Sequence, residues 1–353
     1  MQEQKRTGTF ILYAPNVHTG GGFVLLSALL AAWPRSVTLT VFLDRRAHDR
    51  LEPPTDATVF WVDANMRSRL RAELDLRKSA VVDSTVLCFH GLPPLMPISG
   101  RVILFQQNRI LLGLNSLKQF SWKTGLRLST ERIVSRIFRY RVSQYIVQTP
   151  SMKQAVTHWC GALFPRIITE VKVLPFIDSL PVFPLDKRPS PVWDFVYAAD
   201  GEAHKNHRIL LMAWQLLAQE GLYPTLALTL GARDSELTRH IEIAAIEGKL
   251  NITNLGQRRR DEVLAIYASA SAMIFPSTSE SFGLPLVEAA NLSLPILAAE
   301  LDFVRDVCVP VQTFDPLSPV SIARAVKRFL GEPESTLRLR TPSEWWAELL
   351  PES

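Results

Sequence analysis

The apolar residues of this 353-residue chain gather in short runs separated by longer stretches with helical spacing. In the first half, such runs predict strands at residues 9–13, 37–43, 58–62, 85–89, 102–105 and 145–147, and a helix at 22–33. Continuous apolar strands that alternate with helices are typical of a parallel sheet covered on both faces. The pattern therefore predicts an α/β unit with a doubly wound sheet.

A proline-dense stretch interrupts this alternation. Five prolines fall between residues 175 and 191, and residues 186–188 between them are charged. Prolines at this density stiffen a segment that belongs to neither core. We therefore predict a first domain at residues 1–178 and a second at 179–353, with the last helices free to pack back on the first domain.

The alternation resumes after the prolines. Strands are predicted at residues 194–197, 225–230, 252–255 and 272–275, and helices at 207–219, 234–248, 261–270 and 284–292. Two consecutive doubly wound halves leave a cleft between the carboxyl ends of their strands. The predicted fold is α/β, with two Rossmann-like domains facing across a cleft.

Composition excludes several classes of protein. Hydrophobic residues make up 47% of the chain and charged residues 21%, as in ordinary soluble proteins. The three cysteines are far apart and form no C-x-x-C, which argues for a reducing compartment. Residues 1–9 are polar, and the longest apolar run, 23–33, is shorter than the roughly 20 residues that span a bilayer. We expect a cytoplasmic protein that does not span the membrane.

Charge is distributed unevenly along the chain. Residues 101–172 hold 12 Lys and Arg against two acids, a local charge of +10, whereas the whole chain carries +5. Such a field suits a polyanionic partner, either anionic lipid at the inner membrane face or nucleic acid. Within residues 129–141 a basic helical face (Arg132, Arg136, Arg139) and an apolar one (Ile133, Val134, Ile137, Phe138) are expected. The favoured interpretation is a helix that packs on the core by its apolar face, which is compatible with peripheral membrane contact.

The most informative segment for chemistry runs from residue 277 to 290, STSESFGLPLVEAA. Glu280 lies in the turn before a predicted helix, and Glu288 lies about a turn and a half inside it. A carboxylate accepts several hydroxyl donors, so the pair suits the two ends of an elongated sugar-containing ligand. The amides of Gly283 and Leu284 would offer free N–H groups at the helix start, where an anion such as phosphate is favoured.

Two further segments carry candidate chemistry. Gly20, Gly21 and Gly22 precede the first helix, where their backbone lets a ligand approach, but they form neither a dinucleotide fingerprint nor a P-loop. Residues 204–207, HKNH, lie between the first strand and the first helix of the second half. Lys205 can neutralise a diphosphate there as a point charge.

The segment around Glu280 and Glu288 resembles the E-x7-E signature of the retaining glycosyltransferases of family 4, which have the two-domain GT-B architecture. The resemblance implies that Glu280 contacts the donor sugar and Glu288 the ribose of its nucleotide, while Lys205 and the amides of Gly283 and Leu284 hold the diphosphate. The donor-binding set that it implies is completed by Gly21, Gly22, Asn206, Ser281, Phe282 and Arg258. The resemblance to the family covers residues 193–325 well. In the first half it is limited to scattered motifs, which resemble a bacterial surface-polysaccharide subgroup.

One position departs from the family pattern. Most members carry an arginine five residues before the lysine, and this chain has Asp200 there. Arg258 or Arg109 is a candidate for the second positive charge, supplied across the cleft. Because lysine and helix amides take the charge role of a metal and no metal-ligand spacing is present, neither a metal nor a separate cofactor is expected.

The first half contributes candidates for the acceptor side. The segments 89–94 and 105–109 each follow an apolar strand, which places His90, Asn108 and Arg109 toward the cleft. His90 is either a sugar ligand or a structural histidine, with the second favoured, and His18 could contact the donor or the acceptor.

The resulting hypothesis is a retaining, metal-independent hexosyltransferase that moves a sugar from a nucleotide-diphosphate sugar to a saccharide or lipid-linked acceptor in polysaccharide or O-antigen-type biosynthesis. The alternative is a nucleotide-sugar binding or regulatory protein of the same fold with degraded catalysis, which Asp200 supports. A nucleic-acid binder comes third, since the basic stretch lacks the interleaved aromatic residues of a stacking platform.

Overall fold

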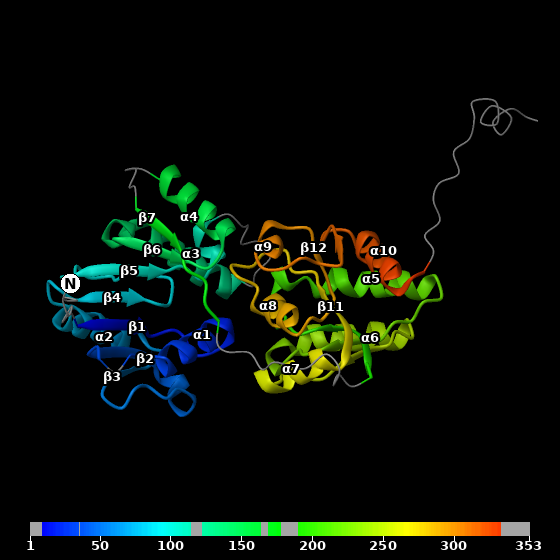
Figure 1. Cartoon of the computed structure of the whole chain (residues 1–353), viewed down its shortest axis with the longest axis horizontal. Coiled ribbons are helices and arrows are strands. Elements are labelled where there is room, and N and C mark those ends of the chain that lie inside the picture. The colour runs from blue at the N-terminus through cyan, green and yellow to red at the C-terminus, as the bar shows by residue number, and fades with distance from the viewer. Residues whose placement is uncertain (1–8, 35, 114–121, 164–168, 178–189, 333–353) are drawn as a thin grey trace, which may run out of the picture.

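The computed structural model describes residues 9–34, 36–113, 122–163, 169–177 and 190–332. They form two lobes, each built on one parallel sheet, that lie side by side along the long axis of the molecule (Figure 1). The predicted border at residues 178–179 and the last helices after residue 332 lie outside the described residues.

The first sheet has seven strands in the order β3-β2-β1-β4-β5-β6-β7. The strands are β1 (Phe10–Ala14), β2 (Leu39–Asp44), β3 (Thr58–Val62), β4 (Thr85–Cys88), β5 (Arg101–Phe105), β6 (Gln144–Val147) and β7 (Glu170–Val173). The helices α1 (Gly20–Ala31), α2 (Met66–Ser79), α3 (Trp122–Phe138) and α4 (Pro150–Ala162) connect them. Successive strands are added toward one edge of the sheet from β1 to β3 and toward the other edge from β4 onward, so the strand order reverses between β1 and β4. Open α/β sheets bind ligands in the crevice at such a point.

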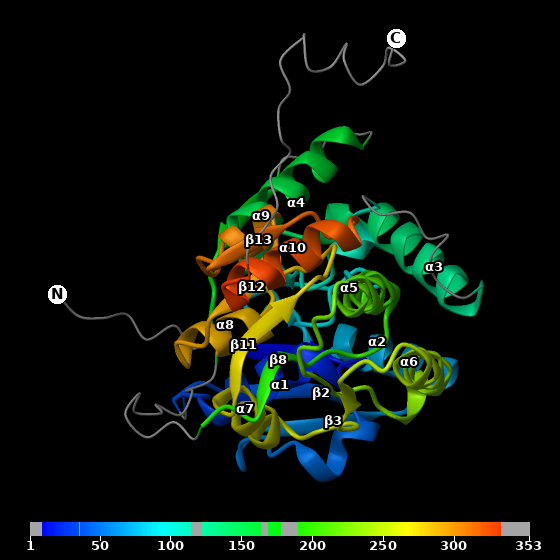
Figure 2. The ribbon, with the colours of Figure 1, turned by 90° about the vertical axis from the view of Figure 1, so that its right-hand side faces the viewer.

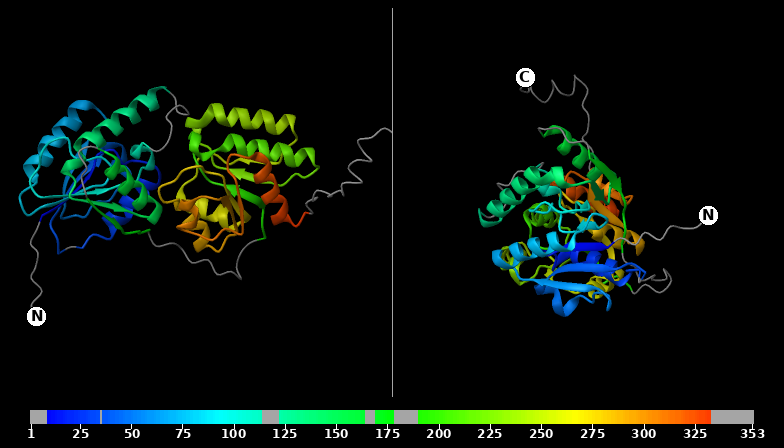
Figure 3. Two further views of the ribbon diagram at one scale, coloured as in Figure 1. Left: turned by 90° about the horizontal axis from the view of Figure 1, so that it is seen from above. Right: turned by 90° about the vertical axis from the view of Figure 1, so that its left-hand side faces the viewer.

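The second sheet repeats this arrangement with six strands in the order β10-β9-β8-β11-β12-β13. Its strands are β8 (Trp193–Tyr197), β9 (Leu226–Leu228), β10 (Ile252–Asn254), β11 (Ala270–Phe275), β12 (Ile296–Ala299) and β13 (Gln312–Phe314). Its helices are α5 (His207–Gln219), α6 (Ser235–Glu247), α7 (Arg260–Ala268), α8 (Leu284–Asn291), α9 (Asp302–Arg305) and α10 (Pro319–Leu330). The corresponding reversal falls between β8 and β11, and helices flank each sheet when the molecule is seen from above (Figure 3).

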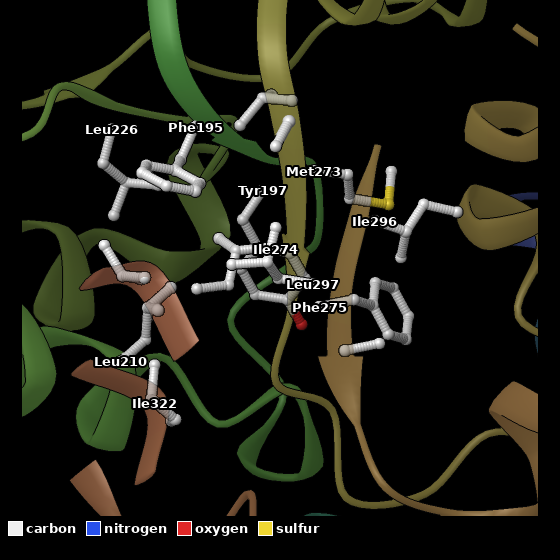
Figure 4. Packing of buried hydrophobic residues seen from close by; sticks show 14 of the residues in the cluster. Phe195, Tyr197, Leu210, Leu226, Met273, Ile274, Phe275, Ile296, Leu297 and Ile322 are labelled. Atoms are coloured by element: carbon white, nitrogen blue, oxygen red, sulfur yellow. The ribbon is translucent and has the colours of Figure 1, made fainter. Parts of the chain in front are cut away.

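The core of the second lobe explains why its elements are fixed so firmly. The central strands β8, β11 and β12 are buried apolar runs, and α5 and α10 pack on them through Leu210 and Ile322 (Figure 4). Phe195 meets Trp214 of α5 edge to face at 5.6 Å. Burying such side chains stabilises each by roughly 1.5–3 kcal/mol. The loops at the strand ends are therefore held on a rigid frame.

Two sequence predictions are corrected by the structure. First, the glycines at residues 20–22 do not form a loop ahead of α1 but its first turn, and Thr19 is the N-cap. Second, the faces predicted for residues 129–141 hold only in part: Ile133 and Ile137 are more than half exposed and Arg139 is buried, whereas Arg136 is exposed as predicted. Helical spacing defines a face but not which side meets the core, and here Leu128 and Ser135 face inward.

Candidate functional site

The loops at the carboxyl ends of β8 and β11 lie against each other. The backbone N–H of Thr278 donates to the carbonyl of His204 at 2.8 Å, and the Thr278 hydroxyl donates to the same carbonyl at 3.2 Å. The Tyr197 hydroxyl, at the end of β8, donates to the carbonyl of Lys205 at 2.8 Å. These bonds hold the lysine loop and the Glu280 loop together, so that residues 75 positions apart meet at one point.

Lys205 and Glu280 form the centre of this junction. Lys205 Nζ lies 2.7 Å from Glu280 Oε1, and the Ser277 hydroxyl donates to the same oxygen at 2.8 Å. Burial alone would lower the pKa of Lys205, but the charges of Glu280 and Asp200 outweigh it, and the pKa is raised. Lys205 is therefore fully cationic at neutral pH.

The second acid of the predicted pair is also bound. Glu288 is buried in α8, and its Oε1 accepts from Arg260 Nε at 2.8 Å. Burial raises the pKa of Glu288 above its usual value, although Arg260 opposes the shift. Arg260 starts α7 and was not among the predicted site residues; the pairing joins α7 to α8.

The start of α8 has the geometry that the sequence predicted. Gly283 is the N-cap in the left-handed region, with φ of +77°. A β-carbon at Gly283 would lie 3.1 Å from Leu286 Cδ1, so both backbone angle and space favour glycine. Pro285, in the first turn, has no N–H, which leaves Gly283 and Leu284 as the backbone donors nearest the loop.

These groups surround one cavity of about 700 Å³ between the lobes. Of the predicted residues, its lining includes Lys205, Glu280, Glu288, Gly21, Gly22, Ser281, Phe282, Gly283, Leu284 and Arg258. The lobes approach closely here, since a β-carbon added to Gly21 of α1 would lie 2.9 Å from Leu284 Cδ1. The structure thus brings together the two acids, the lysine and both glycine segments.

Four predicted acceptor-side residues do not line the cavity. His90 contacts the carbonyl of Tyr13 at 3.3 Å, and burial lowers its pKa to about 4, as for a structural histidine. His18 lies near Asp44, with 3.8 Å between Nδ1 and Oδ2. Asn108 caps a short 3-10 helix by accepting from the N–H of Ile110, and Arg109 begins that helix.

Asn206, predicted to bind the donor, is also outside the lining. Its side-chain amide donates to the carbonyls of Pro276 and Pro316 at 3.1 and 2.7 Å, and its backbone is left-handed with φ of 65°. Both N–H groups are thus committed within the second lobe. Asn206 shapes the turn into α5, and its predicted contact with the donor stays a prediction.

The lining also includes polar residues that the sequence did not single out. Arg233 and Asp234 follow β9, Arg260 follows β10, and Tyr267 belongs to α7. No local motif marks them, but the first three lie past the carboxyl ends of β9, the neighbour of β8, and of β10, one strand farther out, and ligand-binding residues collect at this edge of such sheets. Gln107 and Gln148 line the cavity from the first lobe.

Three of the four cations in the lining are paired with acids. Arg258 lies 3.5 Å from Glu262, and Lys205 and Arg260 hold Glu280 and Glu288. Arg233 is exposed and forms no ion pair with any of the described residues. The described part of the chain contains no cluster of three or more His, Cys, Asp or Glu placed to hold a metal.

The comparison with known proteins follows this geometry. Residues 186–343 match the family of glycosyl transferases group 1. A 92-residue stretch is 35% identical to the serotype-specific mannosyltransferase WbdA of Escherichia coli, covering 26% of this chain and 11% of WbdA. A 115-residue stretch is 32% identical to the O-antigen chain mannosyltransferase B of Escherichia coli, covering 32% of this chain and 30% of that protein. The chain thus spans less than a third of the curated relatives it matches.

Solved structures share the whole architecture. Sucrose-phosphate synthase from Thermosynechococcus elongatus superposes with a TM-score of 0.63 at 15% identity, covering 92% of this chain and 90% of that one. The Anabaena protein HepE, in complex with UDP and glucose, superposes with a TM-score of 0.60 at 15% identity over 91% and 90%. The fold is therefore the GT-B arrangement of two Rossmann-like domains. No described helix is long and apolar enough to cross a bilayer.

Proposed function

We propose that the chain is a retaining glycosyltransferase of the family 4 type, which transfers a hexose from a nucleotide-diphosphate sugar to a saccharide or lipid-linked saccharide. The observation that carries the proposal is the convergence of Lys205, Glu280, Glu288 and the start of α8 on one cavity between the lobes. The family match over residues 186–343 and the two mannosyltransferase relatives support polysaccharide or O-antigen-type biosynthesis as the setting.

The cavity suits each part of such a donor. The amides of Gly283 and Leu284, at the positive end of α8, would hold the diphosphate together with Lys205. Glu280 would orient the sugar through its hydroxyl groups, and Glu288 would bind the ribose. The opposite wall, formed by the first turn of α1, would leave the acceptor to approach from the first lobe.

In the transfer, the acceptor oxygen forms a bond to the anomeric carbon on the face from which the diphosphate departs. The bond from that carbon to the phosphate oxygen breaks, its electron pair stays on the diphosphate, and the acceptor proton passes to the departing oxygen. Lys205 and the α8 amides stabilise the charge that develops on the diphosphate. Because the Lys205 ammonium and the amide dipoles at the start of α8 would stabilise the diphosphate without a metal ion, the proposed reaction is metal-independent and continues in the presence of EDTA.

Arg233 is assigned as the second cation, beside Lys205, that would neutralise the diphosphate. Asp200 occupies the position of the family arginine, and Asp200 and Glu202 both line the cavity, so that side of the site is acidic. Arg233 lines the same cavity from the end of β9 without an ion pair among the described residues. Arg109 is outside the lining, and Arg258 is paired with Glu262.

The acidic Asp200 also favours a second candidate function, a nucleotide-sugar binding protein that does not catalyse transfer. One experiment separates the two. The melting temperature of the purified chain is measured with UDP-, GDP- and dTDP-sugars, since a ligand of the native state raises it. Donor hydrolysis and transfer are then measured with the sugar that binds.

The glycosyltransferase proposal expects stabilisation by one donor, together with sugar release or transfer that Glu280→Ala and Lys205→Ala abolish. Glu236→Ala on the exposed start of α6 is the matched control and leaves both unchanged. Binding without any turnover supports the second candidate. Stabilisation by none of the donors contradicts both.

A further inference from the structure

Two glutamines of the first lobe occupy matching positions on adjacent strands. Strands β5 and β6 pair in parallel with Phe105 opposite Ile146, and the next backbone bond runs from the N–H of Gln106 to the carbonyl of Ile146. Extending this register by two residues places Gln107 beside Gln148, just past the carboxyl ends of both strands. Neighbouring strands lie about 4.8 Å apart, so the two side chains start from adjacent points of one sheet edge. We call these two residues the glutamine pair.

The side-chain amide of each glutamine is anchored to a backbone carbonyl. Gln107 Nε2 donates to the carbonyl of Phe89 at 2.7 Å, and Gln148 Nε2 donates to the carbonyl of Phe176 at 3.0 Å. The oxygen and the nitrogen of a primary amide are bonded to the same carbon, so an anchored nitrogen also fixes the oxygen. The orientation of both Oε1 atoms is therefore set before any ligand binds.

The oxygen of each amide is left without a hydrogen-bond partner among the residues that the structure describes. Both residues line the cavity between the lobes, and Gln148 does so although it is only 7% exposed. Gln107 Oε1 lies 3.0 Å from the place that a β-carbon of Gly22 would take, so it stands against the first turn of α1, which also lines the cavity. Because buried polar atoms are normally hydrogen-bonded, a ligand in this cavity is the expected partner of both oxygens.

The glutamine pair is also tied to the loop that carries Glu280. The Ser281 hydroxyl donates to the carbonyl of Gln107, and the hydroxyl of Thr149, the residue after Gln148, donates to the carbonyl of Ser281 at 3.3 Å. Seen along the long axis, the second lobe lies in front of the first (Figure 2). The glutamine pair and Glu280 therefore face the same part of the cavity from the two lobes.

We propose that Gln107 and Gln148 select the donor by accepting hydrogen bonds from two neighbouring hydroxyl groups of its hexose. Two fixed acceptors that start about 4.8 Å apart can each reach one of two adjacent hydroxyls on a sugar ring. Neither glutamine is charged, so the pair binds hydroxyl groups without competing for the diphosphate. This assignment deepens the proposed function and rests on it, because it concerns the sugar of the same donor.

Selectivity follows from the cost of leaving a fixed acceptor empty. A donor that lacks one of the two hydroxyls leaves one amide oxygen without a partner, and a site built to bind a hydroxyl rejects such an analogue strongly. A carboxylate or phosphate at the same ring position would bring a negative charge against the amide oxygens. The glutamine pair therefore favours an uncharged hexose with two free adjacent hydroxyls.

The test is calorimetric titration of the full chain with UDP-glucose, GDP-mannose and dTDP-glucose. The donor that binds most tightly is then compared with its nucleoside diphosphate and with the analogues that each lack a single hydroxyl of the hexose. We expect two analogues, with neighbouring hydroxyls removed, to bind about tenfold or more weakly than the parent. This comparison uses the wild type and depends on no variant.

Substitutions then assign each hydroxyl to one glutamine. Gln107→Met should bind the parent donor about tenfold more weakly and should no longer discriminate against one of the two analogues. Gln148→Met should lose the discrimination against the other analogue. Both variants should bind the nucleoside diphosphate as the wild type does, because the glutamine pair contacts only the sugar.

Gln106→Met is the matched control. Gln106 is 2% exposed, and its Nε2 donates to the carbonyl of Asn108 at 2.8 Å, so this variant loses the same kind of anchor outside the cavity lining. It should keep the discrimination against both analogues. Loss of that discrimination in all three variants would show a purely structural role and overturn the assignment.

Two other outcomes separate this assignment from the proposed function. If one donor binds and its sugar is transferred, but every analogue binds as tightly as the parent, the glutamine pair does not select the sugar and the proposed function stands. If none of the sugar nucleotides binds, both are refuted.

Discussion

The ammonium group of Lys205 lies 2.7 Å from Oε1 of Glu280, although 75 residues separate the two in the chain. Their side chains are only 16% and 13% exposed. Removing either partner leaves the other charge largely buried without its counterpart. Lys205→Met and Glu280→Gln should each lower the free energy of unfolding by about 1–3 kcal/mol.

The double variant Lys205→Met/Glu280→Gln should be more stable than the sum of the single effects, because neither residual charge remains. Denaturant unfolding of all four proteins measures this coupling. All three variants should lose about 100-fold or more in donor turnover, since the group that stabilises the leaving diphosphate is gone or misplaced. Additive stabilities would show that the pair contributes no coupling.

Arg233 provides a test of the diphosphate site. Arg233→Gln should raise the dissociation constant of the nucleotide-diphosphate sugar by about tenfold, because a charge-assisted contact to phosphate is lost. Calorimetric titration at two salt concentrations should also show a weaker salt dependence. Arg239→Gln, which removes another exposed arginine of the same lobe outside the cavity lining, is the control. Equal affinities of the two variants would rule out the assignment.

Tyr267 offers a prediction in which stability and binding move in opposite directions. Its side chain is 1% exposed, it lines the cavity, and its hydroxyl has no hydrogen-bond partner among the described residues. A buried hydroxyl without a partner costs about 1–3 kcal/mol, so Tyr267→Phe should be as stable as the wild type or more so. If the donor satisfies that hydroxyl, the same variant should bind it about fivefold more weakly. Unchanged affinity would place the hydroxyl outside the ligand site.

His207 predicts how stability depends on pH. Burial lowers the pKa of its imidazole to about 4, and both ring nitrogens lack hydrogen-bond partners among the described residues. Between pH 6.5 and 4 the unfolded chain binds a proton at this position that the folded chain does not. The free energy of unfolding therefore falls as the pH falls through this window, by up to about 1.4 kcal/mol per pH unit.

His207→Phe keeps a ring against Tyr197, which lies 4.9 Å from the imidazole, but removes the titration. Its unfolding free energy should consequently fall less steeply than that of the wild type between pH 6.5 and 4. Urea denaturation at several pH values within the window measures the two slopes. Parallel slopes would mean that His207 is protonated equally in both states.

Much of the fold could be predicted because buried parallel strands are continuous apolar runs. Strand β3 and helix α5 have the bounds that the sequence pattern predicted. The helix α2 was missed because half of its sequence, MRSRLRAELDLRKS, is charged, and β7, with the sequence EVKV, is short and alternates charge with valine. The edge strand β3 was predicted and the inner strand β12 (Ile296–Ala299) was not, so position in the sheet did not decide which strands the apolar pattern revealed.

The candidate site was predictable where its residues share a local motif. Glu280, Gly283 and Glu288 belong to one loop and helix, and their arrangement follows from helical geometry. Arg233 and Tyr267 follow from no such motif, since only strand order brings β9 and α7 beside β8 and β11. The prediction of which side of α3 faces inward failed for a related reason. Tertiary packing decides which side of a helix meets the core, and the spacing of residues in the sequence does not specify that packing.

The residue next to Glu280 ties the two lobes together. The Ser281 hydroxyl donates to the carbonyl of Gln107, and the Thr149 hydroxyl donates to the carbonyl of Ser281 at 3.3 Å. The same peptide segment is thus a wall of the cavity and the seam between the lobes. Any rotation that parts them must break these bonds and pull on the backbone beside the carboxylate. Opening the molecule and disturbing its central acid are consequently a single mechanical event.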